Sequence, residues 1–156
     1  MAELVCLTAL GVVSLFTGIV SLGNSDAFIG AMKTHMSNFH TGSLQTAMNE
    51  LSNHDHSRFL TRTNRKVGRV QHLGHYAAEE GINPAVMREA VVIQMTWPGA
   101  PTIYYGDEAG VFGWTDPDNR RTFPWGKEDL ELTEFHRYLT GIRNRTSVFR
   151  RGAFKP

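Results

Sequence analysis

Residues 51–55 constrain this chain more than any other stretch, because a short apolar approach runs directly into Asn53, His54 and Asp55. These three positions place an amide, an imidazole and a carboxylate side by side. Parallel α/β barrels build their sites at the carboxyl ends of strands, so a strand that ends in such a cluster is typical of that architecture. A simpler interpretation stays open, in which the cluster is a polar turn and Asp55 caps the next segment.

Helical and strand patterns alternate around this stretch. Asn83 followed by Pro84 predicts a helix start, and the β-branched and aromatic run over 100–105 favours a buried strand. Alternating strands and helices predict parallel pairing in an α/β fold. In chain order we expect a helix over about 24–40, a short helical piece and a strand over 44–52, a short helix over 72–81, a helix over 83–97, a strand over 100–105, a loop over 109–127 and a helix over 128–145.

The last of these helices is predicted to be amphipathic. Acidic residues stand at its start and arginines at its end, which matches the helix dipole. The basic groups over 62–69 and 143–151 are expected to be solvated ends of elements. The apolar stripe that we expect to be buried consists of Leu132, Phe135, Leu139 and Ile142.

The number of strands is too small for a complete barrel. Only two convincing strands are present, whereas a (β/α)8 barrel needs eight and typically about 250 residues, against the 156 of this chain. We therefore expect a partial (β/α)8 TIM barrel from a longer gene, with Met1 an internal or misassigned start. Because two strands leave sheet edges unpaired, the chain alone is expected to be marginally stable or prone to aggregate.

The segment before residue 24 admits three interpretations. Residues 4–22 are largely apolar and borderline in length for a membrane helix, and Glu3 stands where a signal peptide needs a positive charge. We favour a buried helix over a membrane helix or a signal peptide. The single cysteine, Cys6, excludes an internal disulfide and leaves the compartment open, with a slight preference for the cytoplasm. A net charge of +1 argues against a general nucleic-acid binder, and we expect no membrane partner.

Three segments together resemble the α-amylase superfamily of glycoside hydrolases. Residues 51–55 resemble the motif that ends the seventh barrel strand, and residues 98–108 resemble the eighth strand. Residues 113–125 are similar to a loop of the neopullulanase, cyclomaltodextrinase and maltogenic amylase branch. The resemblance implies that residues 24–149 form the C-terminal part of the catalytic barrel, roughly its last two β/α units. Residues 150–156 would then begin the connection to a C-terminal domain.

The resemblance also implies a chemistry. Members of the family are retaining α-glycosidases, which need a nucleophile and a general acid about 5–5.5 Å apart. In the family these two carboxylates come from the fourth and fifth strands. Asp55 corresponds to the third catalytic carboxylate, which binds sugar hydroxyls and stabilises the oxocarbenium-like transition state. His54 would donate a hydrogen bond to the same sugar, and Asn53 belongs to the same substrate-binding motif.

A carboxylate pair within the chain does not replace the missing one. Asp107 and Glu108 are adjacent, and neighbouring side chains of an extended segment point to opposite faces. They are therefore not expected to flank one glycosidic bond. Glu108 is expected to be structural, satisfied by the backbone or by an arginine.

The loop after the second strand carries the second functional prediction. Sugar rings stack on aromatic faces, and their hydroxyls suit planar groups such as carboxylate and guanidinium. By resemblance, Trp114, Asp116 and Arg120 contact glucose units on the non-reducing side of the cleavage point, whereas Arg121 is equally well explained as a structural ion-pair partner. The aromatic residues of this region that we expect to be core are Trp97, Tyr104 and Phe123.

The predicted function is thus a fragment of a retaining hydrolase of starch, maltooligosaccharides or cyclodextrins. It carries the transition-state-stabilising aspartate but neither nucleophile nor acid, so the isolated chain is expected to be inactive. The alternative is a catalytically silent, carbohydrate-binding or membrane-associated partner subunit. Paired histidines (54 with 56, 72 with 75) raise a metal hypothesis, but their spacing matches no known helical metal motif, and we expect no metal or other cofactor. Calcium dependence and homo-oligomerisation of the full-length protein stay open.

Overall fold

The computed structural model describes residues 24–154, so the expectations for the apolar segment 1–23 lie outside the described residues. Within residues 24–154, no helix is long and apolar enough to cross a membrane. The elements in chain order are α3 (Ser25–Ser37), α4 (Thr41–Thr46), β1 (Met48–Glu50), α5 (Phe59–Arg62), α6 (Val70–Leu73), the 3-10 turn η1 (Tyr76–Ala78), α7 (Pro84–Thr96), β2 (Ala100–Thr102), the 3-10 turns η2 (Asp107–Ala109) and η3 (Asp118–Arg120), α8 (Leu130–Arg145) and α9 (Val148–Arg151).

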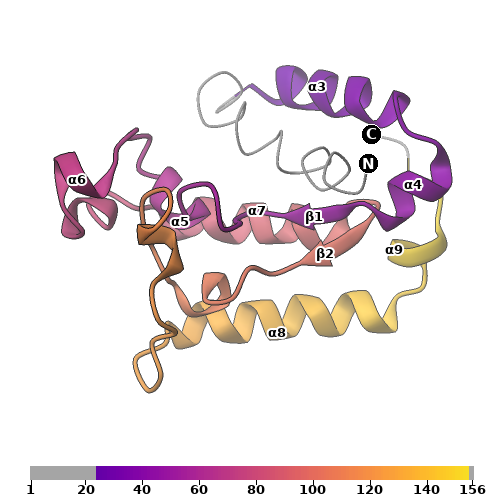
Figure 1. Ribbon diagram of the computed structural model, residues 1–156. Helices are drawn as coiled ribbons and strands as arrows, with labels where there is room; N and C mark the ends of the chain where they lie inside the picture. The colour runs from indigo at the N-terminus through magenta and orange to yellow at the C-terminus, as the bar shows by residue number, and fades with distance from the viewer. Residues whose placement is uncertain (1–23, 155–156) are drawn as a thin grey trace.

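The two strands pair in parallel, as the alternating pattern predicts. Met48 lies opposite Ala100 and Glu50 opposite Thr102. Figure 1 shows both strands running toward the same end of the molecule, where α5, α6 and the loop after β2 lie. The polar clusters that follow β1 and β2 therefore meet at one edge of the sheet, which is where parallel α/β folds carry their sites.

Both strands are shorter than predicted, at three residues each. Beyond β1, the Asn53 side chain accepts hydrogen bonds from the backbone N–H groups of Asp55 and His56, so the backbone there forms a turn instead of a ladder. Beyond β2, Gly106 turns the chain with a φ of 87°, a conformation that glycine adopts without a steric penalty. Local turn chemistry thus redirects the chain a few residues beyond each strand.

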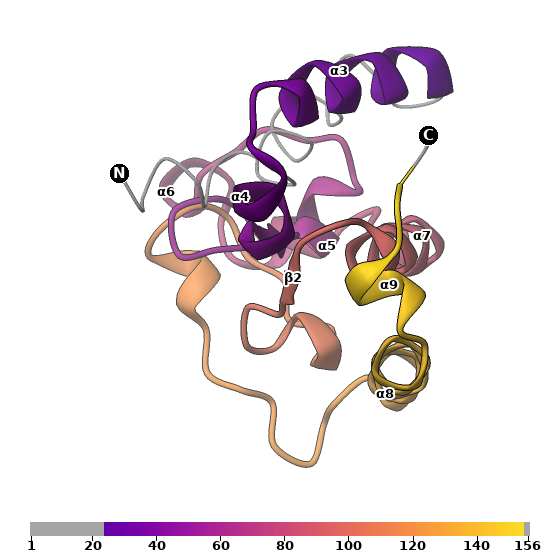
Figure 2. The same ribbon diagram turned by 90° about the vertical axis from the view of Figure 1, so that its right-hand side faces the viewer.

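Helices α7 and α8 cover the same side of the strands (Figure 2). The Asn83 side chain caps α7 by accepting from the N–H groups of residues 85 and 86, and Asp129 caps α8 by accepting from residue 132. Both starts agree with the sequence prediction to within two residues. The buried core joins the two helices to the segments beside β1 and consists of Leu51, Leu60, Met87, Val91, Met95, Leu132 and Leu139, with Phe135 and Ile142 packed against it.

Buried polar side chains tie these layers together, and some correct the sequence prediction. Gln94 of α7 donates to the carbonyls of Asn49 and Thr102, and so fastens the helix to both strands. Arg143 was expected to be solvated but is buried, because its guanidinium donates to the carbonyls of Met95 and Gly99, 2.6 Å away in each case. Carbonyls at a helix end need donors, and a buried arginine supplies two.

Arg62 corrects the same prediction. It donates to the backbone carbonyl of Leu51, and burial lowers the pKa of its guanidinium to about 10, against the raising effect of the nearby Asp107 and Glu50 carboxylates. This arginine therefore belongs to the interior beneath the end of β1 rather than to a solvated helix end.

The core of α7 can be tested with two adjacent valines. Val91 is fully buried, whereas Val92 is 40% exposed. Val91→Ala should lower the free energy of unfolding by about 2 kcal/mol, since it removes buried methyl groups and leaves a cavity. Val92→Ala should change it by less than about 0.5 kcal/mol. The measurement is the urea concentration at which half of the protein resists a pulse of thermolysin, and equal shifts for the two variants would contradict this core.

Candidate functional site

The turn after β1 is built by Asn53. Its Oδ1 accepts from the N–H groups of Asp55 and His56 at 3.0 and 3.1 Å, while its Nδ2 donates to Oε1 of Glu50 at 2.9 Å. This arrangement turns the next two side chains outward. His54 and Asp55 are 62% and 67% exposed, and His54 Nε2 lies 3.5 Å from Asp55 Oδ1.

Three residues of this motif were predicted to contact a ligand. The structure leaves two of them, His54 and Asp55, close together and available to a ligand. Asp55 offers a carboxylate and His54 an imidazole on the same surface, a combination that can accept and donate hydrogen bonds to hydroxyl groups. Asn53 has a structural role instead. Both ends of its amide are used to shape the turn, so it positions Asp55 from within.

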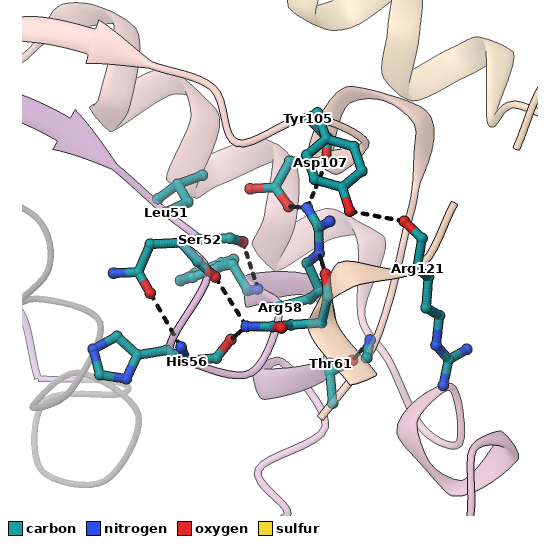
Figure 3. Close-up of polar contacts among 12 residues, drawn as sticks. Leu51, Ser52, His56, Arg58, Thr61, Tyr105, Asp107 and Arg121 are labelled. Atoms are coloured by element: carbon teal, nitrogen blue, oxygen red, sulfur yellow. Dashed lines mark hydrogen bonds and ion pairs between the residues drawn. The ribbon is translucent and has the colours of Figure 1, made fainter. Parts of the chain in front are cut away.

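Arg58 joins this turn to the loop after β2 (Figure 3). The side chain is fully buried. Its Nε donates to the Asn119 carbonyl at 2.7 Å, and its Nη1 donates to the Tyr105 carbonyl at 2.6 Å and to Asp107 Oδ1 at 3.1 Å. The guanidinium also lies over the Tyr104 ring, 4.1 Å from its centroid. Sequence analysis assigned Arg58 no role, because the partners of its side chain lie 47 to 61 residues away along the chain.

The carboxylate that pairs with Arg58 is Asp107, at the other strand end. Burial raises the pKa of Asp107 to about 6, against hydrogen bonds from Ser52 and Arg58 and the charges of Arg58 and Arg62, which act in the opposite direction. Glu108 was expected to pair with the backbone or an arginine. The arginine pairs with the neighbouring Asp107 instead, and the buried Oε2 of Glu108 accepts no hydrogen bond from any residue that the structure describes.

The 3-10 turn η3 holds the Asp55 turn from the opposite side. Asn119, which is fully buried, donates from Nδ2 to the carbonyls of Asn53 and His56 at 3.1 and 2.8 Å. Asn119 and Arg58 therefore connect the loop after β1 to the loop after β2. The asparagine carries no recognisable pattern in the sequence, because its partners lie more than sixty residues away along the chain.

The loop residues predicted to bind glucan separate into two groups. Asp116 and Arg120 form an ion pair about half exposed to solvent, and so present a carboxylate and a guanidinium together. Trp114 corrects the prediction, because its side chain has no exposed surface and its Nε1 donates to the Gly74 carbonyl at 3.0 Å. An indole enclosed in this way packs the interior and offers no face to a sugar.

The other predictions for residues 97–125 have mixed outcomes. Trp97 is buried, as expected of a core residue, whereas Tyr104 and Phe123 are only partly buried. Arg121 is a structural ion-pair partner, with its Nη2 2.9 Å from Asp118 Oδ2. Among residues 24–154, no group of three or more histidine, cysteine or acidic side chains is placed to hold a metal ion.

Two parallel strands with polar loops at their carboxyl ends, backed by helices, define a piece of an α/β fold. The family described as "Alpha amylase, catalytic domain" matches residues 20–147. An amylopullulanase from Thermoanaerobacter thermohydrosulfuricus is 41% identical over 115 residues, which cover 69% of this chain and 7% of that protein. Neopullulanase 2 from Thermoactinomyces vulgaris is 39% identical over 110 residues, covering 69% of this chain and 16% of that protein.

Solved structures of the same kind superpose on the chain. Cyclic alpha-maltosyl-(1→6)-maltose hydrolase from Arthrobacter globiformis gives a TM-score of 0.69 at 27% identity, covering 94% of this chain and 30% of that one. A maltogenic amylase from S. marinus gives 0.67 at 26% identity, covering 91% of this chain and 19% of that one.

The chain belongs to the alpha-amylase catalytic-domain family, and the predicted resemblance is confirmed. Its structural neighbours imply the TIM-barrel fold, of which the described residues form an α/β piece. The chain spans less than a fifth of the length of the two curated relatives given above.

The central place of Arg58 predicts a contrast between two charge-conserving substitutions. Arg58→Lys should lower the free energy of unfolding by about 3 kcal/mol, because lysine keeps the charge but cannot reproduce the planar set of hydrogen bonds to two carbonyls and Asp107. Arg120→Lys, in the half-exposed pair with Asp116, should cost less than about 1 kcal/mol. Thermolysin pulses in urea measure the stability of both variants. If Arg58→Lys were as stable as wild type, the central structural role of Arg58 would be contradicted.

Asp107 predicts a pH dependence of stability. The pKa of Asp107 is about 6 in the folded chain, whereas its ordinary value is 3.8. Between pH 3.8 and about 6, the folded chain therefore keeps a proton on Asp107 that the unfolded chain has lost. The stability that this proton contributes is complete below about pH 4 and is lost as pH rises through about 6. The wild-type chain should therefore lose stability relative to Asp107→Asn between pH 4 and 7. A difference that stays flat or grows in favour of wild type would show that the carboxyl pKa is not raised.

Proposed function

We propose that this chain forms the part of an α-glucan hydrolase barrel that contains strands seven and eight, with β1 and β2 as those strands and residues 24–149 within the barrel. The observation that carries the proposal is the outward placement of Asp55 and His54 at the carboxyl end of β1. There the two side chains stand exposed on a turn that Arg58 and Asn119 hold from beneath.

Asp55 suits the role of the third catalytic carboxylate. Retaining glycoside hydrolysis passes through an oxocarbenium-like transition state, and hydrogen bonds to ring hydroxyls strengthen as positive charge develops. An exposed carboxylate fixed on a rigid turn accepts such bonds without moving during the reaction. His54 at 3.5 Å adds a donor toward the same sugar. The nucleophile and the general acid come, in this proposal, from the fourth and fifth strands of a complete barrel.

Asp116 and Arg120 extend the site. Their ion pair fixes a carboxylate and a guanidinium in one half-exposed unit, and both groups are planar and able to bind vicinal hydroxyls. We assign them to a glucose unit on the non-reducing side of the cleavage point. We assign the substrate class with the help of the relatives, whose names include amylopullulanase, neopullulanase and cyclomaltodextrinase. The proposed class is starch-like glucan, maltooligosaccharide or cyclodextrin.

A chimera tests the proposal. Residues 24–147 of this chain replace the aligned segment of neopullulanase 2 from Thermoactinomyces vulgaris, and kcat/KM is measured on maltotriose. Asp55→Asn should lower kcat/KM by a factor on the order of 10²–10³, the usual loss on removing one preorganised contact to a transition state. Glu79→Gln is the matched control, because Glu79 is an exposed acidic residue that the proposal assigns no part in the site, and it should leave kcat/KM unchanged.

Two outcomes would contradict the proposal. The first is a chimera in which Asp55→Asn retains the parent rate, and the second is a chimera that folds and binds glucan but shows no turnover, which would favour a catalytically silent partner subunit. The isolated chain should not hydrolyse maltotriose. Turnover by the isolated chain that Asp55→Asn abolishes would place the nucleophile and acid within the chain itself.

A further inference from the structure

A surface hollow lies beside the site and has no part in the proposed reaction. It is open to solvent, has a volume of about 450 Å³ and is lined by His75, Tyr76, Arg121 and Thr122. Tyr76 is 84% exposed, so its ring is available to a ligand in this hollow. In Figure 1, the segment around α6 and the orange loop that carries η3 lie at the same end of the molecule, beyond the carboxyl ends of the strands.

His75 is held in a fixed orientation. Its Nδ1 lies 2.5 Å from Oδ1 of Asp118, whose side chain is only 1% exposed. Burial raises the pKa of Asp118, but hydrogen bonds from Arg121, the Trp114 backbone and His75 outweigh it, so that the pKa lies below its ordinary value and the group is a carboxylate. The Nδ1 atom of His75 is therefore occupied by Asp118, so that Nε2 is the ring nitrogen left for a ligand.

Arg121 completes a rigid frame around the same carboxylate. Its Nη2 donates to both oxygens of Asp118, at 3.1 and 2.9 Å, and to the backbone carbonyl of His75 at 2.9 Å. The guanidinium also rests on the Phe112 ring, 4.5 Å from its centroid. Because His75 and Arg121 are already held by these contacts, a ligand that enters the hollow meets two preorganised side chains, and their ordering costs little entropy on binding.

The chemistry of the hollow suits a neutral polyhydroxyl ligand. The charges of Asp118 and Arg121 cancel, so the hollow has no excess charge to attract an anion or a cation. Tyr76 offers an aromatic face for the apolar side of a sugar ring. His75 Nε2 and the Thr122 hydroxyl offer hydrogen-bonding groups for the sugar hydroxyls.

The short turn η3 links the hollow to the proposed site. Asp118 and Asn119 are neighbours in η3: the first fixes His75, and the second fixes the turn that bears Asp55. The exposed pair of Asp116 and Arg120 belongs to the same segment. A glucan that reaches Asp116 and Arg120 thus has a prepared surface beside it.

We propose that Tyr76 and His75 form an outer binding position for a further glucose unit of an α-glucan, beyond the unit assigned to Asp116 and Arg120. The inference rests on the proposed function for the identity of the ligand. It assigns the segment over 70–81 a role in holding long chains, so that maltohexaose binds more tightly than maltotriose.

Affinity electrophoresis of the 156-residue chain through gels containing glycogen tests this position without any turnover, so a failure of the hydrolytic proposal leaves the result readable. Tyr76→Ala should weaken binding to glycogen about tenfold, the loss expected for one stacking contact, whereas Tyr76→Phe should bind as wild type. Tyr138→Ala is the matched control, since Tyr138 is a 63% exposed tyrosine on α8, and it should bind as wild type.

Three results would overturn the inference. These are a wild-type chain that glycogen does not retard, a Tyr76→Ala variant retarded as strongly as wild type, and equal losses for Tyr76→Ala and Tyr138→Ala. A Tyr76→Ala variant that binds glycogen normally but elutes at a different size on gel filtration would show that another copy of the chain covers the ring. Circular dichroism checks that each exposed-tyrosine variant keeps its helices.

Discussion

The buried guanidinium of Arg58 sets the geometry of everything at the carboxyl ends of the two strands. Its desolvation costs several kcal/mol, which hydrogen bonds and an ion pair must offset. The Nε and Nη1 atoms find partners, whereas Nη2 has none among the residues that the structure describes. Those partners are Asp107 and the carbonyls of Tyr105 and Asn119, and the Arg58 N–H adds the Gly113 carbonyl at 2.9 Å. All of them lie after β2, so Arg58 cannot be satisfied until that loop has folded against the turn after β1.

Because of this constraint, the buried and the exposed polar residues have different roles. Arg58, Asn119 and Asn53 use their side chains on backbone groups and hold the turn in one shape. His54 and Asp55 are released to the surface by that same turn. Preorganised sites in enzymes have this form, with groups that contact the ligand resting on others whose bonds are already made. The pattern supports binding of a hydroxyl-rich ligand by the exposed members.

What the sequence could predict depended on how local the signal was. The helix starts at Asn83 and Asp129 follow from capping chemistry, and the parallel strands from alternation with helices. The type of a residue alone does not indicate which residues far along the chain its side chain contacts. Trp114 was therefore taken for a ligand platform although its indole bonds to the Gly74 carbonyl inside the protein, and Arg143 was taken for a solvated charge although it caps carbonyls of buried segments.

A crystal structure of the neopullulanase 2 chimera with bound maltotriose is the most direct test of the central claim, that Asp55 contacts the sugar at the cleavage point. The account predicts an Asp55 carboxylate oxygen within about 2.5–3.0 Å of sugar hydroxyls, with His54 beside the same ring. A sugar bound at the carboxyl ends of the strands with Asp55 turned to solvent would contradict it, and the motif after β1 would then be a polar turn and no more.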